Sequence, residues 1–551
     1  MQRRIFSTGR SLRFALLASI VGWSAVFSYV EATVYAQTAP APTIDPLQDV
    51  LEKGQALESE QRWSEALNHY ENALRTHPED RRLSDRLDLA KIQYDLGRRY
   101  GDPSFRQALA TLDARTALDL YAEVVLKIDT YYVIKPAWSR LVARGTRSLD
   151  LALSRQAFRQ ANVPNTDAAQ IDAFRRELRR LADARDVRTR HDARQIVEQI
   201  VHVAYERIAL PPTAVVFEYV CGASGGLDDY SAYLSGNQLK DIYSQIEGNF
   251  VGLGVELKAD DGALLIVHVI SGSPAERSGV RTGDRIVAVG GRSTHELSTD
   301  QAASLLQGAE GSYADITVVT PDEQPRRLVV RREHIEVPSV EGVRMVDPDY
   351  GIGYLKLSSF QKTTSRDLDG ALWKLHRQGM RSLIMDLRGN PGGLLTSAVE
   401  VADKFIRDGG IVSTRGRNPQ EAFHYDAHRL GTWQVPLVVL IDGDSASASE
   451  IFAAAIRDHR RGYVVGTRSY GKGSVQGIFP LGAAGAGIRL TTAKFFSPNG
   501  HPISHIGVDA DLVVHQVARP ADGQQVTRRK DGADPVLDAA VQAARRQTAS
   551  R

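Results

Sequence analysis

The strongest constraint on the fold is a regular alternation of apolar runs and helical patterns after residue 350. Short β-type runs occupy 352–357 (IGYLKL), 382–388 (SLIMDLR), 435–442 (VPLVVLID) and 462–466 (GYVVG). Segments with apolar residues at helical spacing separate them, near 365–378, 395–407 and 447–458. Strands that alternate with helices usually pair in parallel, because each helix carries the chain back to the starting edge. We therefore predict an α/β core with a largely parallel sheet over 336–515.

A small β-rich domain is predicted over 245–335. From Val251 onward, short β-type runs are separated by turn residues such as SGSPAERSGVRTGD (271–284). One helix-like piece, DQAASLLQG (300–308), lies among them. This pattern is typical of a compact domain built from about five or six strands and one helix.

Residues 111–244 are predicted to be helical. Leu118, Tyr121, Val125 and Ile128 show the apolar spacing of a helix that packs on a core. An Arg-rich insert near 155–200 carries charges of both signs, which is typical of a solvated helix face. Together with the core and the β-rich domain, this helical region makes the chain a multi-domain α+β protein.

Residues 47–110 predict a helical hairpin of the tetratricopeptide type. The small and aromatic positions of such a repeat are filled by Gly54, Leu57, Ala66, Tyr70, Ala73 and Pro78. A degenerate second copy begins near Leu96. One or two such units must pack on something else, so an adaptor or substrate protein is the expected partner. The alternative is an ordinary amphipathic hairpin.

The first 36 residues predict an export signal. Four arginines precede an uncharged stretch at 14–30, and Val34-Tyr35-Ala36 offers a small-residue cleavage site. The uncharged stretch is at the lower length limit of a membrane span, so an uncleaved anchor is the alternative. A linker rich in Pro and Ala follows at 37–46. We expect an exported protein of the periplasm or cell envelope, with membrane association only through this segment.

The composition excludes some partners and metal sites. The 551 residues include 68 Lys and Arg against 66 Asp and Glu, a net charge of +2, which gives no argument for a nucleic-acid partner. Cys221 is the one cysteine, so an intrachain disulfide framework and a multi-cysteine metal site are excluded. We interpret Cys221 as a small, inert core residue.

Two turns at strand ends in the predicted core carry the residues that could take part in a reaction. In DLRGNPGGLL (386–395), Gly389, Gly392 and Gly393 let a ligand approach the backbone closely. The second turn, DGDSASASEIF (442–452), joins a strand to a helix and offers three serines. A serine in the first turn of a helix lies beside unpaired backbone N–H groups, which is the geometry that an acyl-transfer nucleophile needs.

A serine nucleophile needs a base, and the sequence offers two candidates. His459 lies on the same predicted helix, about 18 Å along its axis from Ser447, and suits a helix-end cap better. Lys472 lies between two glycines, where burial would lower the pKa of its amine toward neutrality. Gln476 could hold that amine by a hydrogen bond.

The residue types leave two questions open. They do not identify which of Ser445, Ser447 and Ser449 is the nucleophile. They also allow a purely structural interpretation, in which these serines cap a helix and Lys472 is a surface lysine. A nucleotide-binding interpretation of G-x-x-x-x-G-K at 466–472 fails, because Gly473 replaces the metal-binding Ser or Thr and no helical pattern follows.

Several long motifs between residues 115 and 515 resemble the carboxyl-terminal processing peptidases, serine peptidases also called tail-specific proteases. In the order of that family these are LDDYSAYLS (227–235), DLRGNPGG (386–393), SASASEI (445–451), RSYGKGSVQ (468–476) and TAKFFSPNGHPI (492–503). The resemblance implies that Ser447 is the nucleophile, Lys472 the base and Gln476 the residue that orients it. It implies an oxyanion hole of the Ala448 and Gly393 amides, with Gly392 as the alternative to Gly393. The implied reaction is peptide hydrolysis through an acyl-enzyme, with no cofactor and no metal.

Residues 245–335 resemble the PDZ domain that these peptidases carry. The stretch GLGV, made of Gly252, Leu253, Gly254 and Val255, matches the carboxylate-binding loop, and 273–291 matches the turn and strand that follow. The resemblance implies that the apolar C-terminal tail of a protein or peptide substrate binds there as an added strand. It also implies that this domain can gate access to the active site.

The sequence departs from the family pattern at several places. The family motif L-D-P-H-S reads LDDYS at 227–231, which we interpret as a structural turn whose change need not touch catalysis. The hairpin before 110 and the Arg-rich insert lie outside the usual pattern and bear on substrate recruitment and on an expected homo-oligomer. Residues 516–551 are interpreted as a C-terminal tail. The alternative function is an inactive scaffold that binds peptide tails, which the intact Ser447, Lys472 and Gln476 disfavour.

Overall fold

The computed structural model describes residues 46–183, 186–260, 263–296, 305–306, 308–321, 323–428, 431–515 and 534–549. The predicted export signal lies outside these ranges, as do the linker up to residue 45 and most of the helix predicted at 300–308. Among the described helices, none is both long enough and apolar enough to cross a membrane. The chain divides into two compact units, residues 1–90 and 91–551.

The first unit is a helical hairpin with a following helix. Its elements are α1 (Pro46–Ser59), α2 (Trp63–Thr76) and the start of α3 (Arg81–Gly101). Tyr70 packs directly on Gly54, where a Cβ atom would lie 2.3 Å from the tyrosine ring. The Tyr70 hydroxyl donates a hydrogen bond of 2.6 Å to Glu58. The small and aromatic positions therefore form the contact between α1 and α2, while the assignment as a tetratricopeptide repeat stays a prediction.

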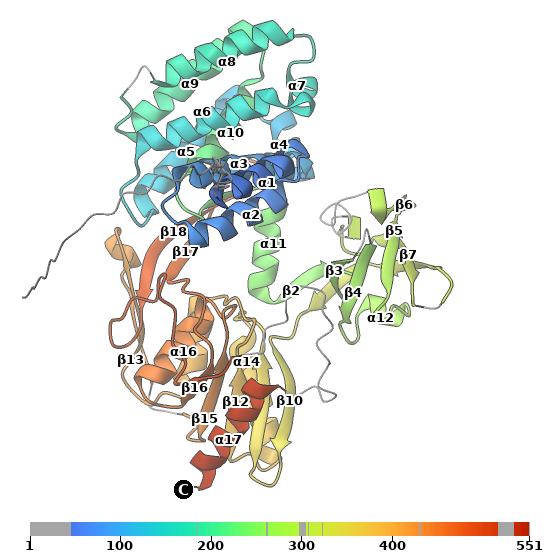
Figure 1. Ribbon diagram of the computed structural model, residues 1–551, viewed down its shortest axis with the longest axis vertical. Helices are drawn as coiled ribbons and strands as arrows, with labels where there is room; N and C mark the ends of the chain where they lie inside the picture. Colours follow the sequence, from blue (N-terminus) through green and yellow to red (C-terminus); the bar gives the residue numbers. More distant parts are fainter. Residues whose placement is uncertain are drawn as a thin grey trace, which may run out of the picture. The chain divides into compact units, whose positions relative to one another are not determined.

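The second unit begins with a helical region, as predicted (Figure 1). After α3 it contains α4 (Pro103–Thr111), α5 (Ala114–Tyr131), α6 (Trp138–Ser154), α7 (Gln156–Asn162), α8 (Ala168–Asp183), α9 (Arg190–Ile208) and α10 (Pro212–Gly225). Helix α10 is buried from Thr213 to Ser224 and carries Glu218, which accepts hydrogen bonds from Tyr100 (2.8 Å) and Ser148 (2.6 Å). Burial raises the pKa of the Cys221 thiol on the same helix, which fits an inert core residue.

The Arg-rich insert includes α8, an amphipathic helix. Its apolar residues Ile171, Phe174 and Leu178 are buried. On its polar face, Arg175 forms an ion pair of 2.8 Å with Asp150 of α6. The mixed charges of this helix therefore belong to its solvated side, as the sequence predicts.

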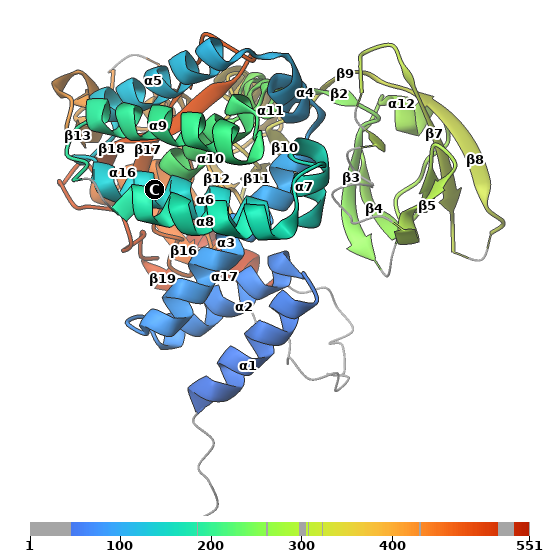
Figure 2. The same ribbon diagram turned by 90° about the horizontal axis from the view of Figure 1, so that it is seen from above.

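The β-rich domain folds around one antiparallel sheet (Figure 2). Helix α11 (Gly236–Glu247) precedes it, and β2 (Asn249–Gly252) pairs with β9 (Glu333–Glu336) where the chain enters and leaves. The sheet order is β3-β4-β5-β7-β8, with β6 paired to β5. Its elements are β3 (Val255–Asp260), β4 (Ala263–Val269), α12 (Pro274–Arg277), β5 (Arg285–Val289), β6 (Arg292–Ser293), η1 (Thr294–Glu296), β7 (Tyr313–Val319) and β8 (Arg326–Arg331). Strand β3 lies at the edge of this sheet.

The predicted α/β core is confirmed. Its sheet has the order β10-β11-β12-β15-β16-β19, and every pair from β11 onward is parallel. The strands are β10 (Val340–Asp347), β11 (Ile352–Leu357), β12 (Ser382–Asp386), β15 (Leu437–Ile441), β16 (Tyr463–Gly466) and β19 (Leu512–Val513). Helices α14 (Thr364–Arg377), α15 (Leu395–Asp403) and α16 (Ala448–Asp458) pack on one face.

A second, antiparallel sheet lies beside the core and connects it to the helical region. Its strands are β1 (Ala232–Leu234), β13 (Gly410–Gly416), β14 (His424–Asp426), β17 (Ser474–Pro480) and β18 (Gly487–Phe496), with η2 (Pro419–Glu421) between β13 and β14. Strand β18 pairs with β1, β13 and β17. The loop that holds Lys472 leads directly into β17, so a strand follows this loop where a nucleotide site would need a helix.

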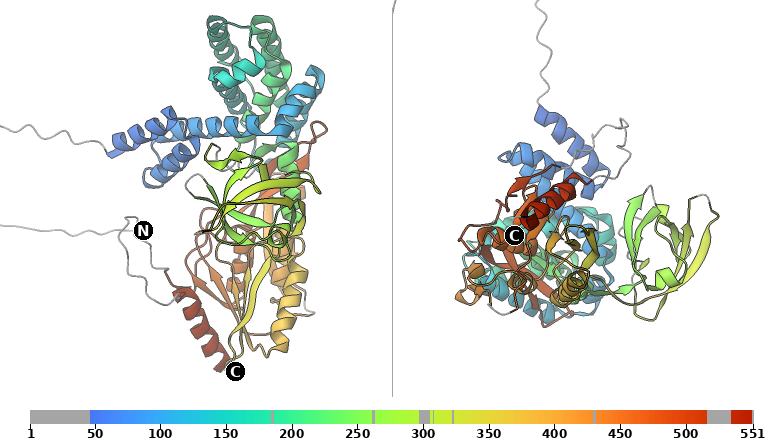
Figure 3. Two further views of the ribbon diagram at one scale, coloured as in Figure 1. Left: turned by 90° about the vertical axis from the view of Figure 1, so that its right-hand side faces the viewer. Right: turned by 90° about the horizontal axis from the view of Figure 1, so that it is seen from below.

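The other face of the core sheet is covered by a C-terminal helix, α17 (Pro535–Ala549) (Figure 3). Its buried residues Val536, Ala540 and Ala544 recur every fourth position and pack on the sheet. The sequence interpretation gave only a tail at 516–551, whereas this part of it belongs to the packed core. The four-residue spacing was the available signal.

Candidate active site

Ser447 lies at a sharp turn between β15 and α16. Its backbone angles are φ 56° and ψ −112°, a conformation with positive φ that residues other than glycine rarely adopt. Such strain persists where the surrounding structure fixes the backbone, often at functional sites. A strained strand-to-helix turn of this kind presents the nucleophilic serine in α/β-hydrolases. The turn arises here without the G-x-S-x-G pattern.

The three candidate serines differ in their surroundings. Ser445 is buried and its Oγ donates to the Leu387 carbonyl at 2.8 Å. Ser449 is also buried, and its Oγ donates to the Asn390 carbonyl at 3.0 Å. Both hydroxyl groups therefore fasten the glycine-rich turn 386–395 to the start of α16. Of the three serines, only Ser447 has a side chain that is not buried.

The glycine-rich turn lies against Ser447. A Cβ atom on Gly392 would be 2.7 Å from the Ala446 carbonyl and 2.8 Å from Ser447 Cβ, and one on Gly393 would be 2.1 Å from the Phe360 carbonyl. The N–H of Gly392 donates to Asn390 Oδ1 at 2.8 Å. In the described part of the chain, the N–H groups of Gly393 and Ala448 donate to no acceptor. These two amides are therefore unoccupied; Ala448 directly follows Ser447, and Gly393 directly follows the Gly392 that packs on Ser447.

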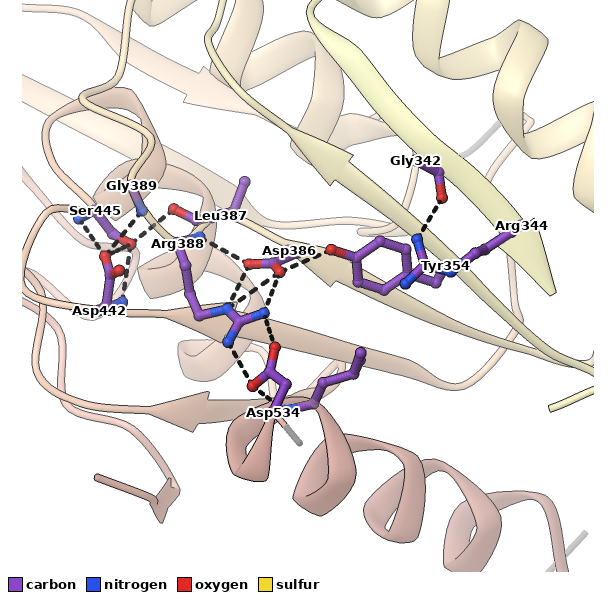
Figure 4. Close-up of polar contacts among 11 residues, drawn as sticks. Gly342, Arg344, Tyr354, Asp386, Leu387, Arg388, Gly389, Asp442, Ser445 and Asp534 are labelled. Atoms are coloured by element: carbon purple, nitrogen blue, oxygen red, sulfur yellow. Dashed lines mark hydrogen bonds and ion pairs between the residues drawn. The ribbon is translucent and has the colours of Figure 1, made fainter. Parts of the chain in front are cut away.

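A polar network ties this turn to the rest of the core (Figure 4). The guanidinium of Arg388 lies between Asp386 of β12 (2.6 Å) and Asp534, the residue before α17 (2.7 Å). Asp442 accepts the backbone N–H groups of Gly389 (3.0 Å) and Ser445 (3.1 Å). The glycine-rich turn is thus held both by the C-terminal helix and by the turn 442–450, called the nucleophile turn after the predicted role of Ser447.

Lys472 lies half-buried in the loop between β16 and β17. Burial lowers the pKa of its amine below the ordinary value, the Arg489 cation acts in the same direction, and Glu450 opposes the change. Its Nζ atom lies 5.0 Å from the ring centroid of Tyr230. The turn 227–231 therefore touches the predicted base. From the sequence we interpret this turn as a structural one whose change need not touch catalysis, and its contact with Lys472 was not predicted.

The predicted catalytic side chains are near one another in the fold but are not joined by hydrogen bonds. Within the described residues, Lys472 Nζ makes no hydrogen bond to Ser447 or to Gln476. The Gln476 side-chain amide instead donates to the carbonyl (3.1 Å) and the Oγ (2.9 Å) of Ser474. His459 follows the last residue of α16, and its ring nitrogen lies 2.7 Å from the carbonyl of Gly410 in β13, not from a carbonyl of its own helix.

Glu450 joins the nucleophile turn to the loop 466–476 that holds Lys472, called the lysine loop, and it was not among the predicted site residues. This buried side chain accepts hydrogen bonds from the backbone N–H groups of Ser447 (2.7 Å), Gly471 (2.6 Å) and Lys472 (2.9 Å), and from Ser469 Oγ (2.6 Å). Burial raises the pKa of its carboxyl group, and these hydrogen bonds oppose that rise. The available signal was its place three residues after Ser447 at a helix start.

The predicted carboxylate-binding loop of the β-rich domain lies between β2 and β3. Gly254 has a φ of 86°, and a Cβ atom there would lie 2.2 Å from Ser273 Cβ, so this position requires glycine. Leu253 is buried in the domain core, and its carbonyl accepts the Ala275 N–H at 2.9 Å. Among the described residues, the N–H groups of Leu253 and Gly254 donate to no acceptor. Gly252 ends β2 and Val255 begins β3.

Comparison with known proteins identifies the family. Residues 351–514 match Peptidase family S41, and residues 265–320 match a PDZ domain. The carboxy-terminal-processing protease of Bartonella bacilliformis is 39% identical over 297 residues, which are 53% of this chain and 67% of that protein. The carboxyl-terminal-processing protease of a Synechocystis species is 35% identical over 285 residues, which are 50% of this chain and 66% of that protein. A solved photosystem II D1 C-terminal processing protease is 23% identical with a TM-score of 0.41, covering 74% of this chain and 95% of its own.

The chain belongs to the carboxy-terminal-processing proteases of peptidase family S41 and carries a PDZ domain. It spans about two thirds of the length of the two curated relatives described above. This confirms the predicted family, the α+β fold class and the class of enzyme, a serine-type peptidase and so a hydrolase.

Proposed function

We propose that the chain is an endopeptidase in which Ser447 is the nucleophile and Lys472 the general base. The observation that carries this proposal is the environment of Ser447. It is the one candidate serine that is not buried, and it lies at a strained strand-to-helix turn. The unoccupied amides belong to Ala448, the next residue, and to Gly393, which follows the Gly392 that packs on Ser447. This combination suits attack on a carbonyl carbon with stabilisation of the oxyanion that develops.

The reaction follows from these groups. Ser447 Oγ attacks the scissile carbonyl while its proton passes to the neutral Lys472 amine, and the oxyanion accepts hydrogen bonds from the Ala448 and Gly393 amides. As the C–N bond breaks, Lys472 returns the proton to the leaving amine, which leaves an acyl-enzyme. Water then attacks the ester with Lys472 again as base, and Ser447 is regenerated. Each of these steps uses only side chains and amides of the protein together with water.

Lys472 suits this role because burial lowers the pKa of its amine. A lysine that is neutral near working pH is an effective base, whereas an ordinary lysine amine is almost fully protonated there. Since no hydrogen bond joins Lys472 to Ser447, the amine moves from the Tyr230 ring toward Ser447 to form the dyad. In that position Gln476 exchanges its contact with Ser474 for one with the amine and orients it.

The PDZ domain supplies substrate recognition in this proposal. The free N–H groups of Leu253 and Gly254 suit a terminal carboxylate, and the edge strand β3, which begins at Val255, suits an added peptide strand. Substrates are then proteins whose apolar C-terminal tails bind this domain. We also propose that an adaptor protein binds the N-terminal hairpin and that the chain forms a homo-oligomer. Residues 1–36 direct its export. Determining the N-terminus of the mature protein distinguishes cleavage after Ala36 from a retained anchor.

Peptide cleavage tests this function. The protein is incubated with a peptide that ends in an apolar tail, and products are identified by mass spectrometry for the wild type, Ser447→Ala and the control Ser449→Ala. We expect cleavage by the wild type and by the folded control, none by Ser447→Ala, and weaker cleavage when the C-terminus of the peptide is amidated. Equal cleavage by Ser447→Ala would refute the assignment of the nucleophile. Tight binding of the peptide tails without cleavage of any of them would favour the scaffold.

A further inference from the structure

Tyr230 is fixed beside the lysine loop by its own backbone. Its N–H donates to Asp228 Oδ1 at 2.9 Å, and its carbonyl accepts a hydrogen bond of 2.7 Å from Arg489 Nε on β18. The next residue, Ser231, accepts the Thr491 N–H with its Oγ at 3.1 Å. The turn 227–231 is thus fastened to β18, and the Tyr230 ring is held at a defined place next to Lys472.

The Lys472 amine lies over the ring of Tyr230. Nζ lies 5.0 Å from the ring centroid, and in the described residues no carboxylate, carbonyl or hydroxyl accepts a hydrogen bond from it. The negative face of an aromatic ring attracts a cation at this distance and attracts a neutral amine only weakly. Tyr230 therefore favours the protonated form of Lys472, in opposition to burial.

Other charged groups also face this pair. Arg489 of β18 disfavours the Lys472 cation, while Glu450 of α16 favours it. Burial, with Tyr470, Asp229, Asp228 and Glu450, raises the pKa of Tyr230 to about 12. The phenol is thus neutral at physiological pH, and the group that changes charge in this contact is Lys472.

We propose that Tyr230 is a positioning residue for the general base: its ring holds the protonated Lys472 amine away from Ser447 and releases it on deprotonation. This inference rests on the proposed function, in which neutral Lys472 accepts the Ser447 proton. Because the ring prefers the cation, the protonated amine stays over Tyr230, whereas the neutral amine is free to reach Ser447. Loss of the proton then both creates the base and frees it to reach the nucleophile.

Two substitutions distinguish the effect of the aromatic face of Tyr230 from the effects of its apolar bulk and of its hydroxyl group. Tyr230→Phe keeps the aromatic face and removes the hydroxyl, while Tyr230→Leu keeps an apolar side chain and removes the aromatic face. The apparent pKa of Lys472 is measured by labelling with trace 1-fluoro-2,4-dinitrobenzene across pH and quantifying the modified peptide, with the exposed Lys135 as internal standard. The acidic limb of kcat/KM is measured on the same proteins. Tyr230→Met and thermal melts control for misfolding.

We expect Tyr230→Leu and Tyr230→Met to lower the apparent pKa of Lys472 by about half to one unit, because the cation loses the aromatic face. The acidic limb of kcat/KM should move to lower pH by the same amount, and Tyr230→Phe should keep both values at the wild-type position. Unchanged labelling in the folded Leu and Met variants overturns the inference. So does an equal shift in Tyr230→Phe, which would assign the effect to the hydroxyl.

The two readouts also separate failure of this inference from failure of the proposed function. A labelling shift without a matching shift of the acidic limb would mean that the ring contacts Lys472 but Lys472 is not the base. That result overturns the proposed function and with it the positioning role. Unchanged labelling in the variants, with an acidic limb that still coincides with the labelling pKa of Lys472, would overturn the positioning role alone, because Lys472 would remain the base without any influence of the ring.

Discussion

The nucleophile turn (442–450) and the lysine loop (466–476) meet at Glu450 but are held in different ways. In the first, Ser445 and Ser449 donate to carbonyls of the glycine-rich turn, and Ser447 is held in a strained backbone conformation. In the second, Glu450 holds the backbone of Lys472, while the Lys472 amine lies over the ring of Tyr230. In the proposed mechanism, the nucleophile and its two amides are thus arranged in advance. The proposed dyad then forms by movement of one lysine side chain.

The nucleophile turn provides the largest expected effect. Ser447→Ala should lower kcat by about 10⁴- to 10⁶-fold, since it removes the attacking atom. Ser449→Ala removes a buried hydrogen bond from the same helix and should cost about 1–3 kcal/mol of unfolding free energy, with a far smaller effect on kcat. Peptide cleavage and thermal melts measure both. A loss of kcat in folded Ser449→Ala as large as that in Ser447→Ala would contradict the distinction drawn between these serines.

The lysine loop provides the next largest effect. Lys472→Met removes the base and should lower kcat by roughly 10³- to 10⁴-fold. In the wild type, kcat/KM should fall as pH drops through the Lys472 pKa, because the neutral amine exists only above that pKa, which burial places below the usual value. The pH profile of His459→Ala serves as the control and should keep this limb. A limb that disappears in His459→Ala would move the base to that histidine.

Glu450 tests the connection between the two regions. Glu450→Gln keeps the size of the side chain, but an amide nitrogen cannot accept the N–H groups that two carboxylate oxygens now accept. We expect about a 10- to 100-fold loss of kcat and a lower melting temperature, since buried donors are left without partners. A variant with wild-type kcat and KM would show that the nucleophile turn and the lysine loop keep their places without this carboxylate.

The smallest effect is expected at the C-terminal helix. Asp534→Asn weakens the ion pair that joins α17 to Arg388 and, through it, to the glycine-rich turn. Asp534 is partly exposed, so we expect a loss of about 0.5–1.5 kcal/mol in stability and a few-fold loss of kcat with little change in KM. Asp538→Asn, an exposed residue of the same helix, is the matched control. Equal effects of the two substitutions would argue against a role of α17 in positioning the turn.

The sequence predicted the α/β core well because its strands are buried on both faces. Every residue of β12 and β15 is buried, and the sequence shows them as apolar runs, at 383–385 in β12 and along the whole of β15. Helix α17 was missed because its buried face is made largely of alanine, which gives a weak apolar signal. The choice among the three serines depends on burial and on one unusual φ angle, and neither of these can be read from residue types.

The parts of the site that the sequence did not predict depend on long-range contacts. Glu450 binds Gly471 and Lys472, which come from the loop after the next strand. Tyr230 contacts Lys472 across the interface between the turn before β1 and the loop before β17. Only the folded chain brings such residues together, so spacing in the sequence carries no signal for them.

The central claim is tested most directly by trapping the acyl-enzyme. The full chain is mixed with a slowly hydrolysed activated ester at a series of pH values, and the modified peptide is identified by mass spectrometry. The account predicts an adduct on Ser447 that forms faster as pH rises through the Lys472 pKa, is lost in Lys472→Met and persists in His459→Ala. An adduct on any other residue, or Ser447 acylation in Lys472→Met at the wild-type rate and pH profile, would contradict it.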